Sequence, residues 1–256
     1  GIRSEFTRLG ENVETLMECE NTAQHYIDLM DQIAARGLDG EVSVKLTQLG
    51  YDIDVERTLE RAQRLAAKAS EGGRTFWIDM EGSAYAEGTI SFYERLKATH
   101  ANTGLCLQAY LRRTAADIQR LMPLDPRIRL VKGAYAEPDT IAYQSRHDVD
   151  TSFVALAVAL LEGRQQGRDV RLGLGTHDVR LIEQIAEHAT AMGLPKTSFE
   201  VQMLYGIRMD QQRRLVSEGY AVRDLISYGH AWYPWYMRRL AERPANVVFA
   251  LRQIIG

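Results

Sequence analysis

The chain has 256 residues, of which 45% are apolar and 25% are charged, and its formal net charge is −3. This near balance of charge excludes a dedicated nucleic-acid binder, which would carry a strong basic excess. The apolar runs are too short for a transmembrane span, and the first residues do not read as a signal peptide. We therefore expect a cytoplasmic protein whose two cysteines, Cys19 and Cys106, stay reduced in its core.

Short β-branched or aromatic runs alternate along the chain with stretches of helical period. A polar loop separates each run from the stretch that follows it. The runs predict eight strands, at Arg3–Leu9, Glu41–Leu46, Thr75–Asp79, Thr103–Tyr110, Arg127–Lys132, Val170–Gly175, Phe199–Leu204 and Ala221–Tyr228.

The segments between the strands are predicted to be helices. Apolar residues recur in Val55–Ala69 mostly at spacings of three and four. In the segment Asp148–Gln166, Asp150 is a suitable cap, and Asp178 can cap the helix that follows the sixth strand. Pro244 would break a continuous helix, so the last segment is expected to form two.

Eight strands alternating with about eight helices give about 32 residues per unit, which is typical of a (β/α)8 barrel. A doubly wound sheet is the alternative, because it has the same alternation. No linker, low-complexity stretch or close repeat divides the sequence. We therefore predict an α/β fold, with one (β/α)8 domain over residues 1–256.

Polar side chains stand at the ends of seven predicted strands, where a barrel places its chemistry. Any one of them alone is more often a solvated boundary residue or part of an ion pair. Period-2 alternation places Lys45 and Asp79 on inward faces, and we expect them to pair in the mouth of the barrel. The strand-end residues are Lys45, Asp79, Glu81, Gln108, Tyr110, Arg129, Lys132, Tyr135, Thr176, His177, Asp178, Gln202, Tyr205, Tyr228 and His230.

Two adjacent arginines, Arg238 and Arg239, open the helix after the last strand. The helix dipole disfavours cations at this end, so an anionic group is expected nearby. Arginine forks bind carboxylates and phosphates in a bidentate manner. The alternative is a basic surface turn in which Glu242 pairs with both arginines.

Other signals in the sequence are weaker. Gly173-Leu174-Gly175 lacks the third glycine of a dinucleotide-binding loop, so it is read as tight strand–helix packing. His177 has no second His or Cys at ligand spacing, and we expect no metal site.

An ordered set of motifs extends from the first predicted strand to the last helix. The motifs are Arg8–Glu11, Val42–Leu46, Ile78–Glu81, Leu107–Leu111, Arg129–Tyr135, Glu137-Pro138, Thr176–Asp178, Glu200–Ile207 and Arg238–Asn246. Together they resemble the catalytic barrel of the flavin-dependent proline dehydrogenase family. Each motif alone is weakly specific, whereas their order and spacing over nearly the whole chain are specific.

The resemblance implies FAD bound non-covalently across the mouth of the barrel. It places the Arg129 guanidinium near flavin N5 and Gln108 at the edge of the isoalloxazine ring. The other cofactor-binding residues that it implies are Val131, Gly133, Ala134, Thr176, His177, Gln202 and Glu242.

The activity implied by the resemblance is oxidation of L-proline to Δ1-pyrroline-5-carboxylate in proline catabolism, by hydride transfer from C5 to flavin N5. A quinone-type acceptor would reoxidise the flavin. Lys45, Asp79 and Arg129 are the implied catalytic residues, and Arg238 with Arg239 would clamp the substrate carboxylate. The remaining substrate-binding residues would be Tyr135, Leu204, Trp235, Tyr228 and Glu11.

The chain departs from the family pattern at three positions. Leu225 and Trp235 stand where the family usually has tyrosines, and Gly82 replaces a position that is often acidic. Changes in hydrogen-bonding groups of a pocket alter specificity by roughly 1–3 kcal/mol or more. The alternative activities are therefore oxidation of another cyclic or N-alkyl amino acid, or a binding role for a barrel that has lost catalysis.

The expected partners are a small amino-acid substrate and the electron acceptor, without nucleic acid. No amphipathic basic helix stands out, so contact with the inner membrane is expected to be weak or absent. The sequence leaves the oligomeric state open.

Overall fold

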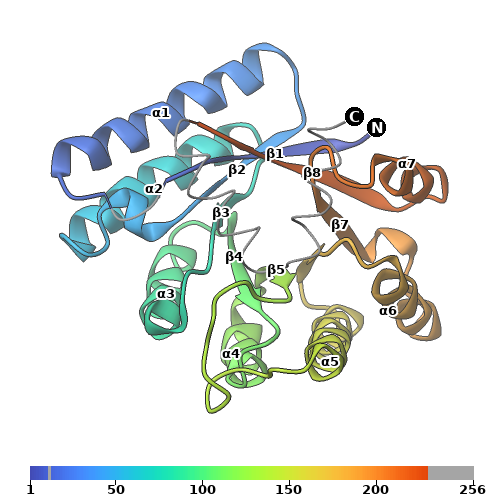
Figure 1. Ribbon diagram of the computed structural model, residues 1–256. Coiled ribbons are helices and arrows are strands. Elements are labelled where there is room, and N and C mark those ends of the chain that lie inside the picture. The colour runs from blue at the N-terminus through green and yellow to red at the C-terminus, as the bar shows by residue number, and fades with distance from the viewer. Residues whose placement is uncertain (11–12, 230–256) are drawn as a thin grey trace, which may run out of the picture.

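The computed structural model describes residues 1–10 and 13–229. Eight parallel strands close into a barrel in the order β1 to β8, and helices surround it on the outside (Figure 1). The strands are β1 Arg3–Arg8, β2 Gly40–Val44, β3 Phe76–Ile78, β4 Thr103–Gln108, β5 Arg127–Val131, β6 Arg171–Gly175, β7 Phe199–Leu204 and β8 Ala221–Tyr228. The α-helices are α1 Leu16–Ala35, α2 Val55–Glu71, α3 Ser83–Lys97, α4 Thr114–Leu121, α5 Arg146–Gln165, α6 Val179–Ala191 and α7 Met209–Ser217. Short 3-10 turns are η1 Leu46–Leu49, η2 Met122–Leu124 and η3 Lys196–Ser198.

The pairing of β1 with β8 closes the sheet and confirms the predicted barrel over the doubly wound alternative. It runs in register from Arg3 opposite Arg223 to Arg8 opposite Tyr228. All eight predicted strands are present, each within two residues of its expected ends. The two helices predicted in Trp235–Ile255 lie outside the described residues, and the assignment of residues 1–256 to one domain stays a prediction.

The helix starts follow local capping chemistry, with one correction. Ser145 caps α5 by accepting a hydrogen bond from the Asp148 N–H at 3.0 Å, whereas Asp150 lies within the helix and pairs with Lys132. The expectation that Asp150 caps this helix is therefore wrong. Asp178 does occupy the N-cap position of α6.

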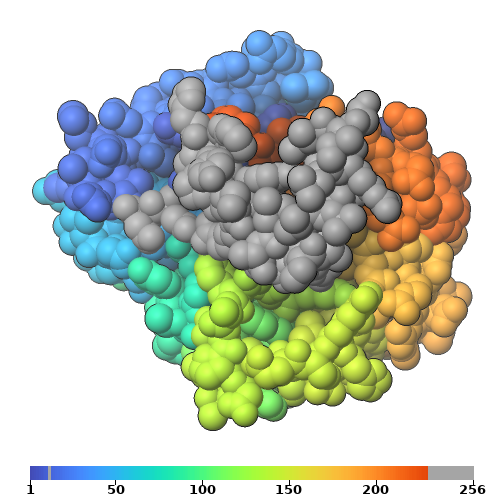
Figure 2. Space-filling view, in the orientation of Figure 1, coloured from blue at the N-terminus to red at the C-terminus, as the bar shows by residue number. Residues whose placement is uncertain are grey.

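The apolar core lies between the outer face of the barrel and the helices. On α2, for example, Ala62, Leu65 and Ala66 are buried against it, while Glu60 and Arg64 are exposed. In the space-filling view, the chain segments that contain the helices of Figure 1 form the rim of the molecule (Figure 2). Cys19 and Cys106 are both buried free thiols, as predicted.

No helix in the described part of the chain combines the length and the apolar character that crossing a membrane requires.

Charged side chains inside the barrel form two levels along its axis. We name the level near the strand N-termini the lower ionic cluster, which consists of Glu41, Arg171, Glu200 and Arg223. Arg171 Nη1 donates to Glu41 Oε1 at 2.6 Å, and Arg223 Nε donates to Glu200 Oε1 at 2.7 Å. This cluster closes the end of the barrel that usually serves stability, and it leaves the opposite end for the site.

Candidate active site

The second charged level lies toward the strand C-termini and consists of Glu5, Ser43, Asp79 and Arg129, which we name the upper polar cluster. Arg129 on β5 extends across the barrel, where its Nη1 pairs with Glu5 on β1. Its Nη2 pairs with Asp79 and donates to Ser43 Oγ at 2.9 Å. Ser43 Oγ in turn donates to Asp79 Oδ1 at 2.6 Å. Residues of β1 and β2 and the residue that follows β3 therefore fix one guanidinium of β5.

Burial dominates the electrostatics of this cluster. The Arg129 side chain is 4% exposed, and its two carboxylate partners keep its pKa well above the usual value although burial opposes this. Burial raises the pKa of Glu5 more than the nearby Arg129 lowers it. The guanidinium thus stays protonated between two carboxyl groups.

Trp77 separates the two charged levels. Its ring is fully buried, with the guanidinium carbons of Arg129 and Arg171 at 5.3 and 5.4 Å from the ring centroid. Its indole N–H donates to Glu41 Oε2 at 2.7 Å. Trp77 and Asp79, which are two residues apart, both contact Arg129 and so lie on the same face.

Lys45 and Asp79 are neighbours across two strands. The Asp79 N–H donates to the Val44 carbonyl at 2.8 Å, which continues the β2–β3 register one residue beyond the strands. The carboxylate of Asp79 contacts Arg129 and Ser43, a pairing that the sequence did not predict. The Lys45–Asp79 ion pair stays a prediction.

Two buried glutamines lie near the mouth. Gln108 ends β4, and Gln202 on β7 donates from Nε2 to Glu200 Oε1 at 2.9 Å. The Oε1 atoms of both glutamines are buried without a hydrogen-bond partner among the described residues. Such oxygens are candidates to accept hydrogen bonds from a ligand.

The chain after β5 turns sharply beside Gln108. Gly133 has a φ of 117°, and a Cβ there would lie 2.2 Å from the Tyr110 ring, so only glycine fits. Backbone pairing continues past the strands, with the Ala109 N–H bonded to the Val131 carbonyl at 2.8 Å. Val131, Gly133 and the adjoining Ala134 thus line the mouth along their backbone.

Residues at the ends of β6 and β7 are joined through His177. Its Nε2 accepts a hydrogen bond from the Leu204 N–H at 3.2 Å, and Thr176 Oγ1 accepts from the Asp178 N–H at 3.1 Å. The structure therefore brings Thr176, His177, Gln202 and Leu204 to the neighbouring ends of β6 and β7, and their role in cofactor or substrate binding stays a prediction.

Lys132 forms an ionic cluster beside these residues. It pairs with Asp150 and with Asp178, and Arg146 and Arg180 bond to Asp178 from the outside. Burial would raise the pKa of Asp178, but the hydrogen bond from Arg180 and the charge of Lys132 lower it to about 2. Asp178 therefore ties the ends of β5 and β6 and the start of α5 together.

Tyr228 does not join the residues inside the barrel. Its hydroxyl lies 2.7 Å from His25 Nε2 on α1, and its strand neighbour Ser227 has the inward-facing parity. Burial raises the pKa of Tyr228 to about 12. The interpretation of Tyr228 as a substrate-binding residue gains no support from this position.

Tyr135 lies in the loop that crosses from β5 toward α3. The carboxylate of Glu137 accepts from Ser83 N–H and Ser83 Oγ at 2.7 and 2.6 Å. A Cβ added to Gly82 would lie 4.0 Å from Tyr135 Cδ1. Tyr135 therefore lies close to Gly82, at the start of α3.

Sequence reasoning missed Glu5 as a site residue. The alternation Arg3, Glu5, Thr7 on β1 is the signal that could have found it, because alternate residues of a barrel strand face the interior. Six predicted residues, in contrast, lie outside the described residues: Glu11, His230, Trp235, Arg238, Arg239 and Glu242.

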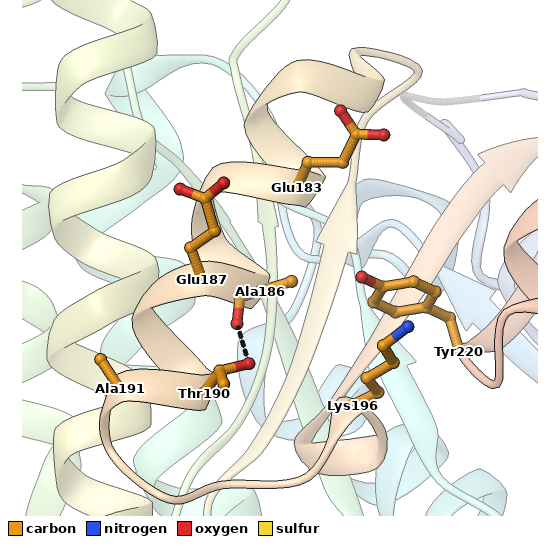
Figure 3. Close-up of a pocket in the computed structure, with 7 residues that line it drawn as sticks. All are labelled: Glu183, Ala186, Glu187, Thr190, Ala191, Lys196 and Tyr220. Carbon is orange, nitrogen blue, oxygen red and sulfur yellow. Dashed lines mark hydrogen bonds between the residues drawn. The ribbon is translucent and has the colours of Figure 1, made fainter.

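A pocket of about 600 Å³ lies elsewhere, on the outer wall between α6 and the start of β8 (Figure 3). Glu183 and Glu187 project from α6, and Lys196 Nζ lies 4.8 Å from the centroid of the Tyr220 ring. The pocket contains none of the predicted site residues and lies toward the strand N-termini, away from the mouth.

Among residues 1–10 and 13–229, no group of His, Cys, Asp or Glu side chains could hold a metal ion.

A closed parallel barrel with a fixed guanidinium in its C-terminal mouth defines a (β/α)8-barrel enzyme. The family model described as proline dehydrogenase matches residues 1–252. The chain therefore belongs to the proline dehydrogenase family, whose members are oxidoreductases.

Individual relatives agree with this assignment. Proline dehydrogenase 1 of Bacillus subtilis subsp. natto is 35% identical over 256 residues, which is all of this chain and 83% of the relative. Proline dehydrogenase of Deinococcus radiodurans is 36% identical over 260 residues, covering 100% of this chain and 82% of the relative.

A solved structure confirms the fold. Proline utilization A from Bdellovibrio bacteriovorus, inactivated by N-propargylglycine, superposes with a TM-score of 0.85 at 23% identity. The match covers 93% of this chain but only 30% of that much longer protein.

Proposed function

We propose that this chain oxidises L-proline to Δ1-pyrroline-5-carboxylate in proline catabolism, with non-covalently bound FAD as its cofactor. The observation that carries the proposal is the fixed Arg129 guanidinium in the mouth of a barrel of this family. The chemistry that FAD supplies when bound is acceptance of two electrons from the C5–H bond of proline.

The residues at the mouth fit a flavin. An isoalloxazine ring carries an N–H that can donate to a buried amide oxygen, such as Oε1 of Gln108 or Gln202. Gly133 allows the backbone near Val131 and Ala134 to approach a flat ring closely. Thr176 and His177 lie where they could hold the remainder of the cofactor.

The chain's own residues would act mainly by position and charge. Arg129 presents a preorganised positive charge that stabilises negative charge arising at the mouth, and Asp79 with Ser43 keeps it in place. Lys45 stands beside Asp79 at the end of β2. Tyr135 and Leu204 would cover the proline ring.

The substrate carboxylate requires cationic partners. The resemblance to the family assigns this task to Arg238 and Arg239, with Trp235, Glu11 and Glu242 nearby. The proposal includes a quinone-type electron acceptor. It also includes a cytoplasmic location, with weak or no contact to the inner membrane, and leaves room for an oligomer.

The test is the visible spectrum of the purified protein after FAD is added. We expect L-proline to bleach the flavin band under anaerobic conditions, with Δ1-pyrroline-5-carboxylate as the product. Arg129→Lys is the matched variant, because it keeps the charge but cannot reach Glu5 and Asp79 together. It should reduce the bleaching rate by at least about tenfold. Protein that takes up no FAD would contradict the proposal.

One observation favours a second candidate, oxidation of another cyclic or N-alkyl amino acid. Leu225 replaces a usual tyrosine of the family, and it lies in register between Glu5 and Leu204 on the inward face of β8. Bleaching by such amino acids with no bleaching by proline would favour this candidate.

A further inference from the structure

Glu5 contacts Arg129 from the opposite side of the barrel. Three strands lie between β1 and β5 in either direction around the closed sheet, so this is the longest reach available inside it. Arg129 nevertheless pairs with Glu5 through Nη1. The Glu5 side chain is 1% exposed, so it lies beneath the guanidinium rather than at the mouth.

The two ends of the guanidinium have different partners. Nη2 is held by Asp79 and Ser43, and Nη1 by Glu5. Contacts at Nη2 alone fix one point and leave the guanidinium free to swing about it. The contact at Nη1 adds the second point, which defines the plane of the group.

The two carboxylates also differ in what else they can reach. The Asp79 side chain is 21% exposed and can meet a ligand, whereas Glu5 is sealed below it. Glu5 lies too deep to touch a substrate, yet it is close enough to offset part of the charge of Arg129.

We propose that Glu5 is a positioning residue of the active site, which fixes the plane of Arg129 and moderates the positive charge that this guanidinium presents to the cofactor. This inference rests on the proposed function, because it takes Arg129 to act on a flavin. The negative charge of a carboxylate beneath Arg129 lowers the positive electrostatic potential at the mouth. Removal of this carboxylate raises that potential and therefore favours the electron-rich reduced flavin.

The main experiment compares Glu5→Gln with Asp224→Asn in FAD-loaded protein. Asp224 is a matched control, since it is a buried carboxylate on the neighbouring strand β8, opposite Ser4, with the outward-facing parity. Glu5→Gln should raise the midpoint potential of the flavin and lower kcat for proline by about tenfold, with a smaller change in KM. Asp224→Asn should leave the potential at the wild-type value.

Two results would overturn the proposal: an unchanged potential in Glu5→Gln, or an equal shift in Asp224→Asn. If Glu5→Gln does not fold, Glu5→Asp replaces it. The shorter side chain withdraws the carboxylate from Nη1, so a wild-type kcat and potential in Glu5→Asp would equally overturn it.

A second measurement needs no flavin. Unfolding free energies of the apoprotein are measured for Glu5→Gln, Arg129→Lys and the double variant. Non-additive losses are expected, because each single change disrupts the same contact. Additive losses would contradict the contact itself. A wild-type protein that binds no FAD would instead refute the proposed function, while the cycle still tests the pairing of Glu5 with Arg129.

Discussion

Trp77 forms an aromatic floor beneath the candidate active site. It stacks between Arg129 above and Arg171 below, and its N–H is taken by Glu41. A large ring in this place keeps the two charged levels apart, so the carboxylates of the lower ionic cluster do not pair directly with Arg129. Gly104 on β4 leaves the space that this ring occupies, because a Cβ at that position would lie 2.4 Å from the ring.

Leu225 is the residue where substrate preference can be tested. It lies on the inward face of β8, in register with Glu5 and Leu204. We expect Leu225→Tyr to narrow the pocket and add a hydroxyl, which should shift the ratio of kcat/KM between proline and bulkier cyclic amino acids by about tenfold toward proline. Steady-state kinetics with both substrates measures this ratio.

The control for this change is Leu225→Met, which conserves volume and adds no hydroxyl. It should leave the ratio near the wild-type value. An unchanged ratio in Leu225→Tyr would show that this side chain does not shape the substrate pocket.

The N-terminus of α3 is stabilised by a carboxylate that is distant in the sequence. Gly82 occupies the N-cap without a side chain, and Glu137, from the loop after β5, bonds Ser83 instead. Negative charge at a helix N-terminus is favourable, so Glu137 supplies from the loop a carboxylate that Gly82 cannot provide. This contact also holds the loop that bears Tyr135.

The start of α2 is capped locally, and its contribution can be measured. Asp54 Oδ1 accepts from the Arg57 N–H at 3.0 Å. We expect Asp54→Ala to lower the free energy of unfolding by about 1 kcal/mol, because it leaves that donor without its cap. The flavin content should not change. Urea unfolding of both proteins measures the difference.

Asp54→Asn provides the control, since an amide oxygen can still accept the hydrogen bond. It should lose only a small part of the stability. Equal losses in Asp54→Asn and Asp54→Ala would mean that the charge of Asp54, rather than its cap, stabilises α2.

Local patterns predicted the elements well because their causes are local. Alternation and apolar spacing depend on neighbouring residues, and the eight strands follow them. The pairing of Arg129 with Glu5 joins residues 124 positions apart, so no local pattern contains it. The same holds for Asp150, which looked like a cap but pairs with Lys132 once β5 and α5 come together.

At the scale of the whole molecule, charge fills the space that apolar side chains usually fill in such barrels. Stability then depends on the interface between strands and helices, and on complete pairing of the buried charges. In the lower ionic cluster, Glu41 and Glu200 both contact Arg171 and Arg223, and Glu200 also pairs with Arg3. Removal of one partner leaves an uncompensated buried charge, which typically costs about 3–5 kcal/mol.

This arrangement predicts acid sensitivity of the fold. Burial alone would raise the pKa of Glu200, but Arg223 outweighs it and holds the pKa at about 2, and the pKa of Glu41 is lowered in the same way by Arg171 and Arg223. The unfolded chain has the ordinary value of 4.5. A carboxyl with a lowered folded pKa stabilises the fold above its unfolded pKa. That stability is lost as the pH falls from about 4.5 toward 2.

We therefore expect the unfolding free energy of the wild-type protein to drop steeply between these pH values, as measured by urea unfolding across that range. Glu200→Gln should be less stable at neutral pH and should show a shallower drop, because one of the titrating groups is gone. Glu56→Gln is the control, since Glu56 forms an exposed ion pair with Arg95 and exposed pairs contribute little. Glu5 has the opposite effect on the pH dependence of stability. Because its pKa is raised in the folded protein, its contribution to stability is present at low pH and is lost as the pH rises through that folded pKa. A drop of equal steepness in Glu200→Gln and wild type would show that acid unfolding begins outside the lower ionic cluster.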